Sequence, residues 1–206
     1  MGEVFVLSLR RFQRSINHLT YKPSSFMKYR LAFALIAIAA LIRLLPHPPN
    51  FTPIGAIALF GAAYFSRQWL MLAIPFAALF LTDLFINNII YRELYGNQFT
   101  LITSWWIYVA FALVMLAGMG WLAKKVNGSR VLGASLSASA IFFLVTNFSV
   151  WAESGMYPKT AAGLAACYTA GIPFLGNTVL GDLFFSAAMF GVYEWSKRKF
   201  DIAVQA

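Results

Sequence analysis

Long apolar runs alternate with short polar segments along almost the whole chain. Each run is bounded by prolines, glycines or charged side chains, which mark helix ends and loops. A helix needs about 20 apolar residues to cross the hydrocarbon core of a bilayer. The pattern therefore predicts an all-α membrane protein, a bundle of six transmembrane helices at residues 26–45, 54–65, 69–87, 101–123, 131–151 and 173–195.

The polar segments between these runs differ in character. Prolines crowd residues 46–53 and exclude a helix there, so we expect a stiff, extended loop. Residues 124–130 form a basic turn, and residues 152–160 form a polar loop. Residues 161–170 are expected to form a short helix that ends at Gly171 and Pro173, with Pro173 in the first turn of the last span.

Three features of this topology leave alternatives open. The run at 54–65 is short for a full crossing, so residues 53–87 could instead form a re-entrant pair. The run at 26–45 could be a signal peptide, because Ala37-Ile38-Ala39 resembles a cleavage site. Met27 could be the true start. The expected division is a basic N-terminal segment at 1–25 (interfacial or disordered), a transmembrane domain at 26–198 and a tail at 199–206.

Composition narrows the class of protein. Of the 206 residues, 60% are hydrophobic and 11% are charged, whereas soluble domains carry roughly 25% charged residues. A soluble domain and a disordered chain are thereby excluded, and the single cysteine, Cys167, excludes an internal disulfide. The net charge of +9 does not indicate nucleic-acid binding, because the basic residues form short clusters between apolar runs.

These basic clusters predict the orientation in the membrane. Of the 16 lysines and arginines, all but Arg43, Arg92 and Lys159 fall in the segments that six crossings would place on the side of the termini. Cytoplasmic loops are enriched in Lys and Arg. We therefore expect both termini in the cytoplasm and a multi-pass protein of the bacterial inner membrane.

Polar side chains gather in the half of the predicted bundle that faces outward. This distribution is typical of a binding cavity that opens to the outside, and we expect the loops 46–53 and 152–160 to act as lids. Asparagines and aspartates would hold the polar groups of a solute, and aromatic side chains would supply its walls. The candidate binding residues are Asn50, Phe51, Asp83, Asn147, Trp151, Tyr157, Asn177 and Asp182.

Several of these residues also have a structural interpretation. Arg43 and Asp83 could simply pair with each other, Asn147 and Asn177 could hydrogen-bond between helices, and Trp151 could be an interfacial aromatic residue. Cys167 is expected to be a buried small side chain, or else a soft metal ligand. Asp182 lies near the middle of its span, where a carboxyl group must be paired or protonated. Small-residue faces, such as Ala134 and Ala138, are expected to pack within the bundle.

Several kinds of chemistry have no motif in the sequence. There is no phosphate-binding loop, no metalloprotease motif and no nucleophile elbow. We therefore expect no enzyme, no cofactor and no metal site. The absence of a phosphate loop and the small size predict a solute-capturing subunit that draws on partner proteins for energy.

Four segments, 43–65, 144–148, 155–168 and 172–182, resemble an uncharacterised family of bacterial integral membrane proteins to which transport is ascribed. The resemblance extends over roughly residues 27–198. More loosely, the six-span plan resembles the substrate-binding S-components of energy-coupling factor (ECF) vitamin transporters. That resemblance implies a binder of a vitamin or micronutrient, with a transmembrane coupling subunit and ATPases as partners.

Two further functions stay open. The chain could be an assembly subunit of a membrane complex with no small-molecule site. It could also be an intramembrane enzyme that uses Asp83 and Asp182, which would require both carboxyl groups to reach one substrate atom.

Overall fold

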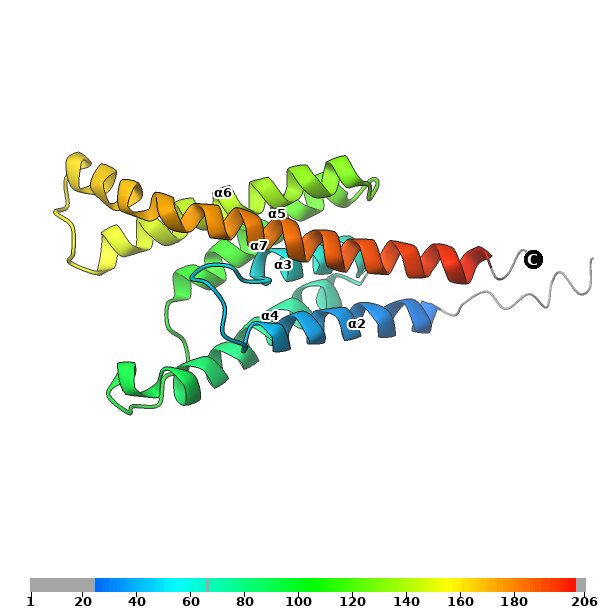
Figure 1. The fold of residues 1–206 in the computed structure, drawn as a ribbon, viewed down its shortest axis with the longest axis horizontal. Coiled ribbons are helices and arrows are strands. Elements are labelled where there is room, and N and C mark those ends of the chain that lie inside the picture. Colours follow the sequence, from blue (N-terminus) through cyan, green and yellow to red (C-terminus); the bar gives the residue numbers. More distant parts are fainter. Residues whose placement is uncertain (1–24, 66, 203–206) are drawn as a thin grey trace, which may run out of the picture.

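A computed structural model describes residues 25–65 and 67–202, and this part of the chain is helical without strands (Figure 1). The expected N-terminal segment and the end of the expected tail lie outside the described residues. Successive long helices run back and forth along one axis. Their bounds are α2 (Ser25–Ile42), α3 (Ile54–Tyr64), α4 (Gln68–Phe85), α5 (Trp105–Leu122), α6 (Gly128–Glu153) and α7 (Ala161–Ile202). A π-helical turn, η1 (Ile86–Ile90), and a short 3-10 helix, η2 (Arg92–Tyr95), follow α4.

Four of the helical segments are long and apolar enough to cross a membrane: Trp69–Ile90, Trp105–Leu122, Gly128–Glu153 and Ala161–Lys199. Two shorter apolar segments, Tyr29–Ile42 and Ile54–Tyr64, accompany them in the described residues. The expectation of a helical membrane protein is therefore confirmed. The exact number of crossings and the orientation of the termini stay predictions.

One element differs from the sequence-based prediction. The expected break at Gly171 and Pro173 is wrong, because α7 continues through both residues as one helix. In a bilayer no water is present to satisfy freed backbone groups, so a helix tends to continue past a proline and to adjust locally. The same holds for Pro75, which lies inside α4.

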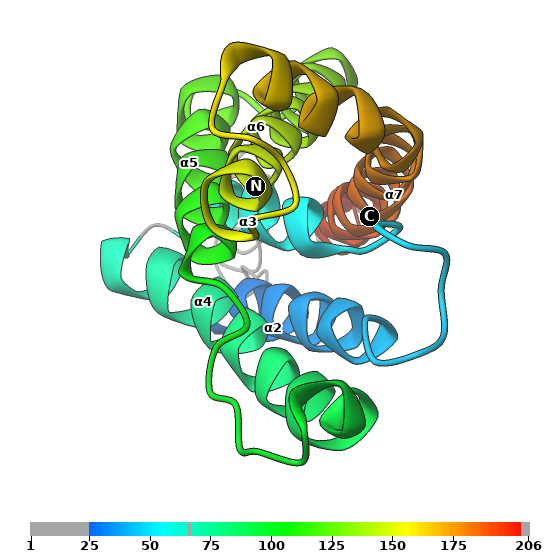
Figure 2. The same cartoon turned by 90° about the vertical axis from the view of Figure 1, so that its left-hand side faces the viewer.

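The short helix α3 lies in the middle of the bundle. It contacts each of the other five long helices, and the view from the end of the molecule shows them arranged around it (Figure 2). Its residues are apolar on all sides, which is the pattern of a fully buried helix. Gly61 allows α4 to approach closely, because a Cβ there would overlap the ring of Pro75.

The small residues of α6 also face the interior. Ala134 and Ala138 are both fully buried within the chain, and Gly133 lies against the ring of Trp121 on α5. The expectation that these small-residue faces pack within the bundle is confirmed for these positions.

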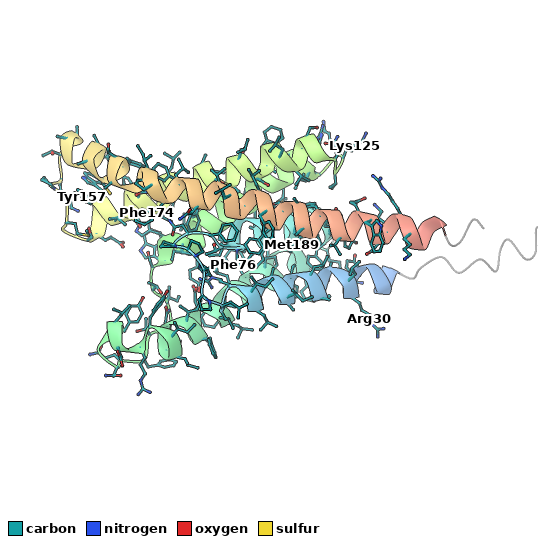
Figure 3. All side chains as sticks on the ribbon, in the orientation of Figure 1. Arg30, Phe76, Lys125, Tyr157, Phe174 and Met189 are labelled. Atoms are coloured by element: carbon teal, nitrogen blue, oxygen red, sulfur yellow. The ribbon has the colours of Figure 1, made fainter. Side chains whose placement is uncertain are left out.

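The two ends of the bundle differ in chemistry. Arg30 and Lys125 lie toward one end, and Tyr157 lies in the loop at the opposite end (Figure 3). We call the first the basic end and the second the loop end. Helix α3 begins partway along this axis and runs toward the basic end (Figure 1), so its N-terminus lies inside the bundle.

Candidate functional site

A cavity of about 830 Å³ lies between the start of α3 and the loop-end halves of the surrounding helices. The segment 43–53 forms one wall, and η1, α5, α6 and α7 form the others. Most of the lining is apolar, with a few polar groups among it. The lining residues are Arg43, Leu44, Leu45, Pro46, His47, Pro49, Asn50, Thr52, Ile54, Gly55, Ile86, Ile90, Tyr91, Ile107, Phe142, Thr178 and Asp182.

The proline-rich wall is held against α7. Asn50 adopts a left-handed backbone conformation (φ 64°), which asparagine tolerates better than most residues. The side-chain amide of Asn177 donates a hydrogen bond to the carbonyl of Pro49 (2.9 Å). Phe51 packs on Phe185, with ring centroids 5.5 Å apart. These contacts fix the path of the chain as it leaves α2 and enters α3.

Asp182 lies where the cavity meets the N-terminus of α3, and only 3% of its surface is exposed. The hydroxyl of Ser139 on α6 donates a hydrogen bond to its Oδ2 atom (2.7 Å). The backbone amide of Gly55, in the first turn of α3, donates a second. Asp182 thus joins three helices through one carboxyl group.

This arrangement supplies what α3 lacks on its own. The first amides of a helix have no partner within it, and they carry a partial positive charge. The N-cap of α3 is Pro53, which makes no side-chain cap hydrogen bond, so Asp182 on α7 takes that role. The close approach requires glycine, because a Cβ at Gly55 would overlap the carboxyl group of Asp182.

Arg43 and Asp83 form an ion pair at the edge of the cavity. The Nη2 atom of Arg43 lies 2.5 Å from Oδ1 of Asp83, and its Nη1 atom donates to the hydroxyl of Thr82. The hydroxyl of Tyr108 donates to the other oxygen of Asp83 (2.9 Å). The structural interpretation of Arg43 and Asp83 as partners is confirmed. Arg43 lines the cavity, while Asp83 lies behind it.

The predicted site residues separate into two sets. The first set lies at the cavity: Asn50 and Asp182 line it, Phe51 and Asn177 hold its proline-rich wall, and Asp83 pairs with the lining residue Arg43. Asn147, Trp151 and Tyr157 lie instead on α6 and on the loop that joins it to α7.

The second set has local partners. The Asn147 side chain donates to the carbonyl of Phe143 (2.8 Å) and lies against Gly171. The indole of Trp151 donates to the carbonyl of Pro158 (2.9 Å), and Tyr157 is half-buried in that loop. The structure does not bring this set to the cavity lining.

Several lining residues were not among the sequence-based candidates. Thr178 is one turn before Asp182 on α7, so their spacing of four residues indicates that both side chains lie on the same face of the helix. Ile86 and Ile90 reach the cavity from the π-helical turn, a geometry that is frequent at functional sites but that no sequence pattern here marked. His47 lies in the proline-rich segment and also lines the cavity.

The cavity offers hydrogen-bonding groups and apolar walls. Asp182 is a strong acceptor, and Thr178 and Asn50 can both donate and accept. Among the described residues, no three His, Cys, Asp or Glu side chains gather as possible metal ligands. Cys167 is buried and its thiol donates to the carbonyl of Asn147, consistent with the expected role as a small buried side chain.

Comparison with known proteins gives one match. A protein-family model described as a family of unknown function, DUF6580, matches residues 24–204. No curated protein and no solved structure matches the chain.

Proposed function

The chain belongs to this family of unknown function, and we propose that it is a membrane transport protein that captures a small solute in the large cavity beside Asp182. The observation that carries the proposal is the cavity itself. Its volume of about 830 Å³ falls within the range of roughly 300–1,000 Å³ that is usual for small-molecule sites. Its lining, mostly apolar with a few placed polar groups, is also typical of such sites.

The proposed topology is six crossings of the bacterial inner membrane, with both termini in the cytoplasm. The basic end, with Arg30 and Lys125, then lies inside, in keeping with the enrichment of Lys and Arg in cytoplasmic loops. The large cavity opens toward the outside. Helix α3 has 11 residues and is about 16 Å long, which is shorter than the hydrocarbon core of about 30 Å. It therefore crosses the bilayer only together with the segment 43–53.

The charges around the cavity favour an uncharged solute with hydrogen-bond donors. Arg43 is already neutralised by Asp83, so it offers little to an anion. Asp182 and Thr178 face the cavity with oxygen atoms. A vitamin-sized solute with amide, amine or hydroxyl groups fits this chemistry, and we propose a vitamin or related micronutrient as its class.

The proposed working arrangement is that of an S-component-like subunit. After capture at the loop end, release at the basic end requires a change of conformation and a source of energy. A transmembrane coupling subunit and ATPases are the partners that this arrangement would use.

Native mass spectrometry of the purified protein tests the proposal directly. We expect a retained small molecule, and we expect the same compound to raise the melting temperature. At a ligand concentration about 100 times Kd, one-site binding stabilises a protein by about 2.7 kcal/mol, which corresponds to roughly 5–10 °C for a chain of this size.

Two matched variants test whether the solute binds in the cavity. Thr178 and Thr169 are both on α7, and each hydroxyl bonds to the carbonyl four residues earlier. Thr178 lines the cavity, whereas Thr169 is outside its lining and exposed. Thr178→Val should weaken the stabilisation by the compound and Thr169→Val should not. An empty protein that no vitamin stabilises would refute the proposal and favour an assembly subunit.

A further inference from the structure

A second, smaller cavity lies between α6 and α7 toward the basic end. Its volume is about 330 Å³, and its lining includes Asn127, Ser135, Phe190, Glu194 and Arg198. Asp182 is part of the lining of the large cavity. The two cavities thus approach the same stretch of the α6–α7 interface from opposite ends of the bundle.

Polar side chains lie between the two cavities. The hydroxyl of Ser139 reaches Oδ2 of Asp182 at 2.7 Å and the carbonyl of Ser135 at 3.1 Å. Ser135 is one turn before Ser139 on α6, and Ser186 is one turn after Asp182 on α7. We call Asp182, Ser139, Ser135 and Ser186 the serine–aspartate file. It begins in the lining of the large cavity and ends, at Ser135, in the lining of the small one.

Two members of the file have an unusual property. The hydroxyls of Ser135 and Ser186 are fully buried, and neither has a hydrogen-bond partner among the described residues. A buried hydroxyl without a partner costs free energy, so such groups usually mark a function or a place for bound water. Both lie one helical turn beyond Asp182 or Ser139, on the side toward the basic end.

We propose that the serine–aspartate file is a proton path through the bundle and that Asp182 is its proton-binding group. This path does not depend on the proposed transport function. Asp182 is in the lining of the large cavity, and Ser135 is in the lining of the small one. The path therefore lies between the two cavities, with Asp182 and Ser139 hydrogen-bonded and with Ser135 and Ser186 one turn beyond them.

The geometry at Ser139 accommodates both protonation states of Asp182. A serine hydroxyl has one hydrogen to donate and lone pairs to accept with. When Asp182 is ionised, Ser139 donates to its Oδ2 atom. When Asp182 is protonated, its O–H donates to Ser139, whose own hydrogen turns to the carbonyl of Ser135. Neither state leaves a buried donor without an acceptor at this contact.

The proton is conserved in each step. A hydronium ion in the large cavity gives a proton to the carboxylate of Asp182, which becomes the neutral acid and leaves water behind. The acid then gives its proton to the oxygen of Ser139, and Ser139 gives its own hydrogen to a water molecule that we place beside the hydroxyls of Ser135 and Ser186. That water becomes hydronium, and Asp182 returns to the carboxylate. From there the proton enters the small cavity, where Glu194 is the carboxyl group in the lining.

Few other charges act on Asp182. From α3 it faces the amide of Gly55 and the positive end of the helix dipole, and from α6 it faces the hydroxyl of Ser139. Arg43 and His47 line the same cavity, but Arg43 is neutralised by Asp83. At the other end of the file, Glu194 accepts from the hydroxyl of Tyr64 (2.9 Å) and pairs with Lys197.

Infrared spectroscopy of the full chain in lipid vesicles tests the proton-binding group without any solute. On acidification we expect a carbonyl band of a protonated carboxylic acid that is absent from Asp182→Asn. Ser139→Ala keeps the carboxyl group but removes its hydrogen bond, so the band should remain and shift in frequency. A spectrum in which neither substitution alters an acid-dependent band would overturn the proposal, and the Ser139 variant decides the matter if Asp182→Asn does not fold.

Thiol labelling tests the path. In a Cys167→Ala background, we expect Ser135→Cys to react with a small charged methanethiosulfonate added to inside-out vesicles. Ala138→Cys is the matched control, because Ala138 is equally buried on α6 but lines neither cavity. Equal labelling of the two, or labelling of neither, would refute a water-accessible file.

These experiments separate the two proposals. A vitamin that binds while Asp182 fails to titrate would leave the transport function standing and remove the proton path. If Asp182 titrates in a protein that binds no vitamin, the proton path would stand and the transport function would be removed.

Discussion

Replacing Gly55 with alanine tests the contact on which the candidate site depends. The added methyl group would overlap Oδ1, Oδ2 and the carboxyl carbon of Asp182. The carboxyl group would have to leave the first turn of α3, and it would lose the Gly55 amide and its bond to Ser139. Gly55→Ala therefore removes the cap of α3 without changing any polar side chain.

The expected cost follows from three contributions. Overpacking a buried site costs about 1–3 kcal/mol, and loss of a helix N-cap costs about 1 kcal/mol. Replacing a helical glycine with alanine returns about 0.5–1 kcal/mol. The net destabilisation is about 1–3.5 kcal/mol, which lowers the melting temperature of a chain of this size by roughly 2–14 °C.

Thermal unfolding in detergent, followed by tryptophan fluorescence, measures the effect. Gly176→Ala is the control, since no heavy atom lies within 4 Å of a Cβ built there, and its melting temperature should not fall. In an Asp182→Ala background, Gly55→Ala should cost little, because the overlap and the cap are both already gone. A full loss of stability in that background would refute the reasoning, since contacting residues must be coupled.

Three other predictions follow from contacts described above. Arg43→Gln should leave Asp83 buried without its countercharge and lower the free energy of unfolding by about 3–5 kcal/mol; unchanged thermal stability would contradict a buried pair. Asn177→Ala should free the carbonyl of Pro49 at a cost of about 1 kcal/mol, visible as faster hydrogen exchange in residues 50–52 but not in α5; equal exchange in both proteins would argue against the tether. Cys167 is 2% exposed, so a maleimide should label it only after denaturation, and rapid labelling of the folded protein would show that α7 packs differently.

The sequence predicted well those features that depend on neighbouring residues. Helix positions followed from the apolar runs, because a membrane span is specified by its own composition. The start of α3 at Ile54 was predicted correctly, since the prolines before it leave no alternative. The pairing of Arg43 with Asp83 was anticipated because both lie at the same ends of predicted spans.

Features that depend on distant packing were not predicted. No local pattern shows that the N-terminus of α3 lies inside the bundle, or that a carboxylate on α7 caps it. Pro173 gave a misleading signal, since the rule that proline ends a helix weakens where the backbone has no water to bond with. The separation of Asn147 and Trp151 from the cavity depends on how α6 and α7 are rotated, which their spacing along one helix could not reveal.

The cap of α3 by Asp182 also constrains how the protein is made. A ribosome completes α3 long before it reaches the codon for Asp182, so the buried end of α3 has no carboxylate partner while the central helices are being synthesised. Until α7 is made, the first amides of this apolar helix lack that partner. We therefore expect the final packing of α3 to follow translation of the last helix.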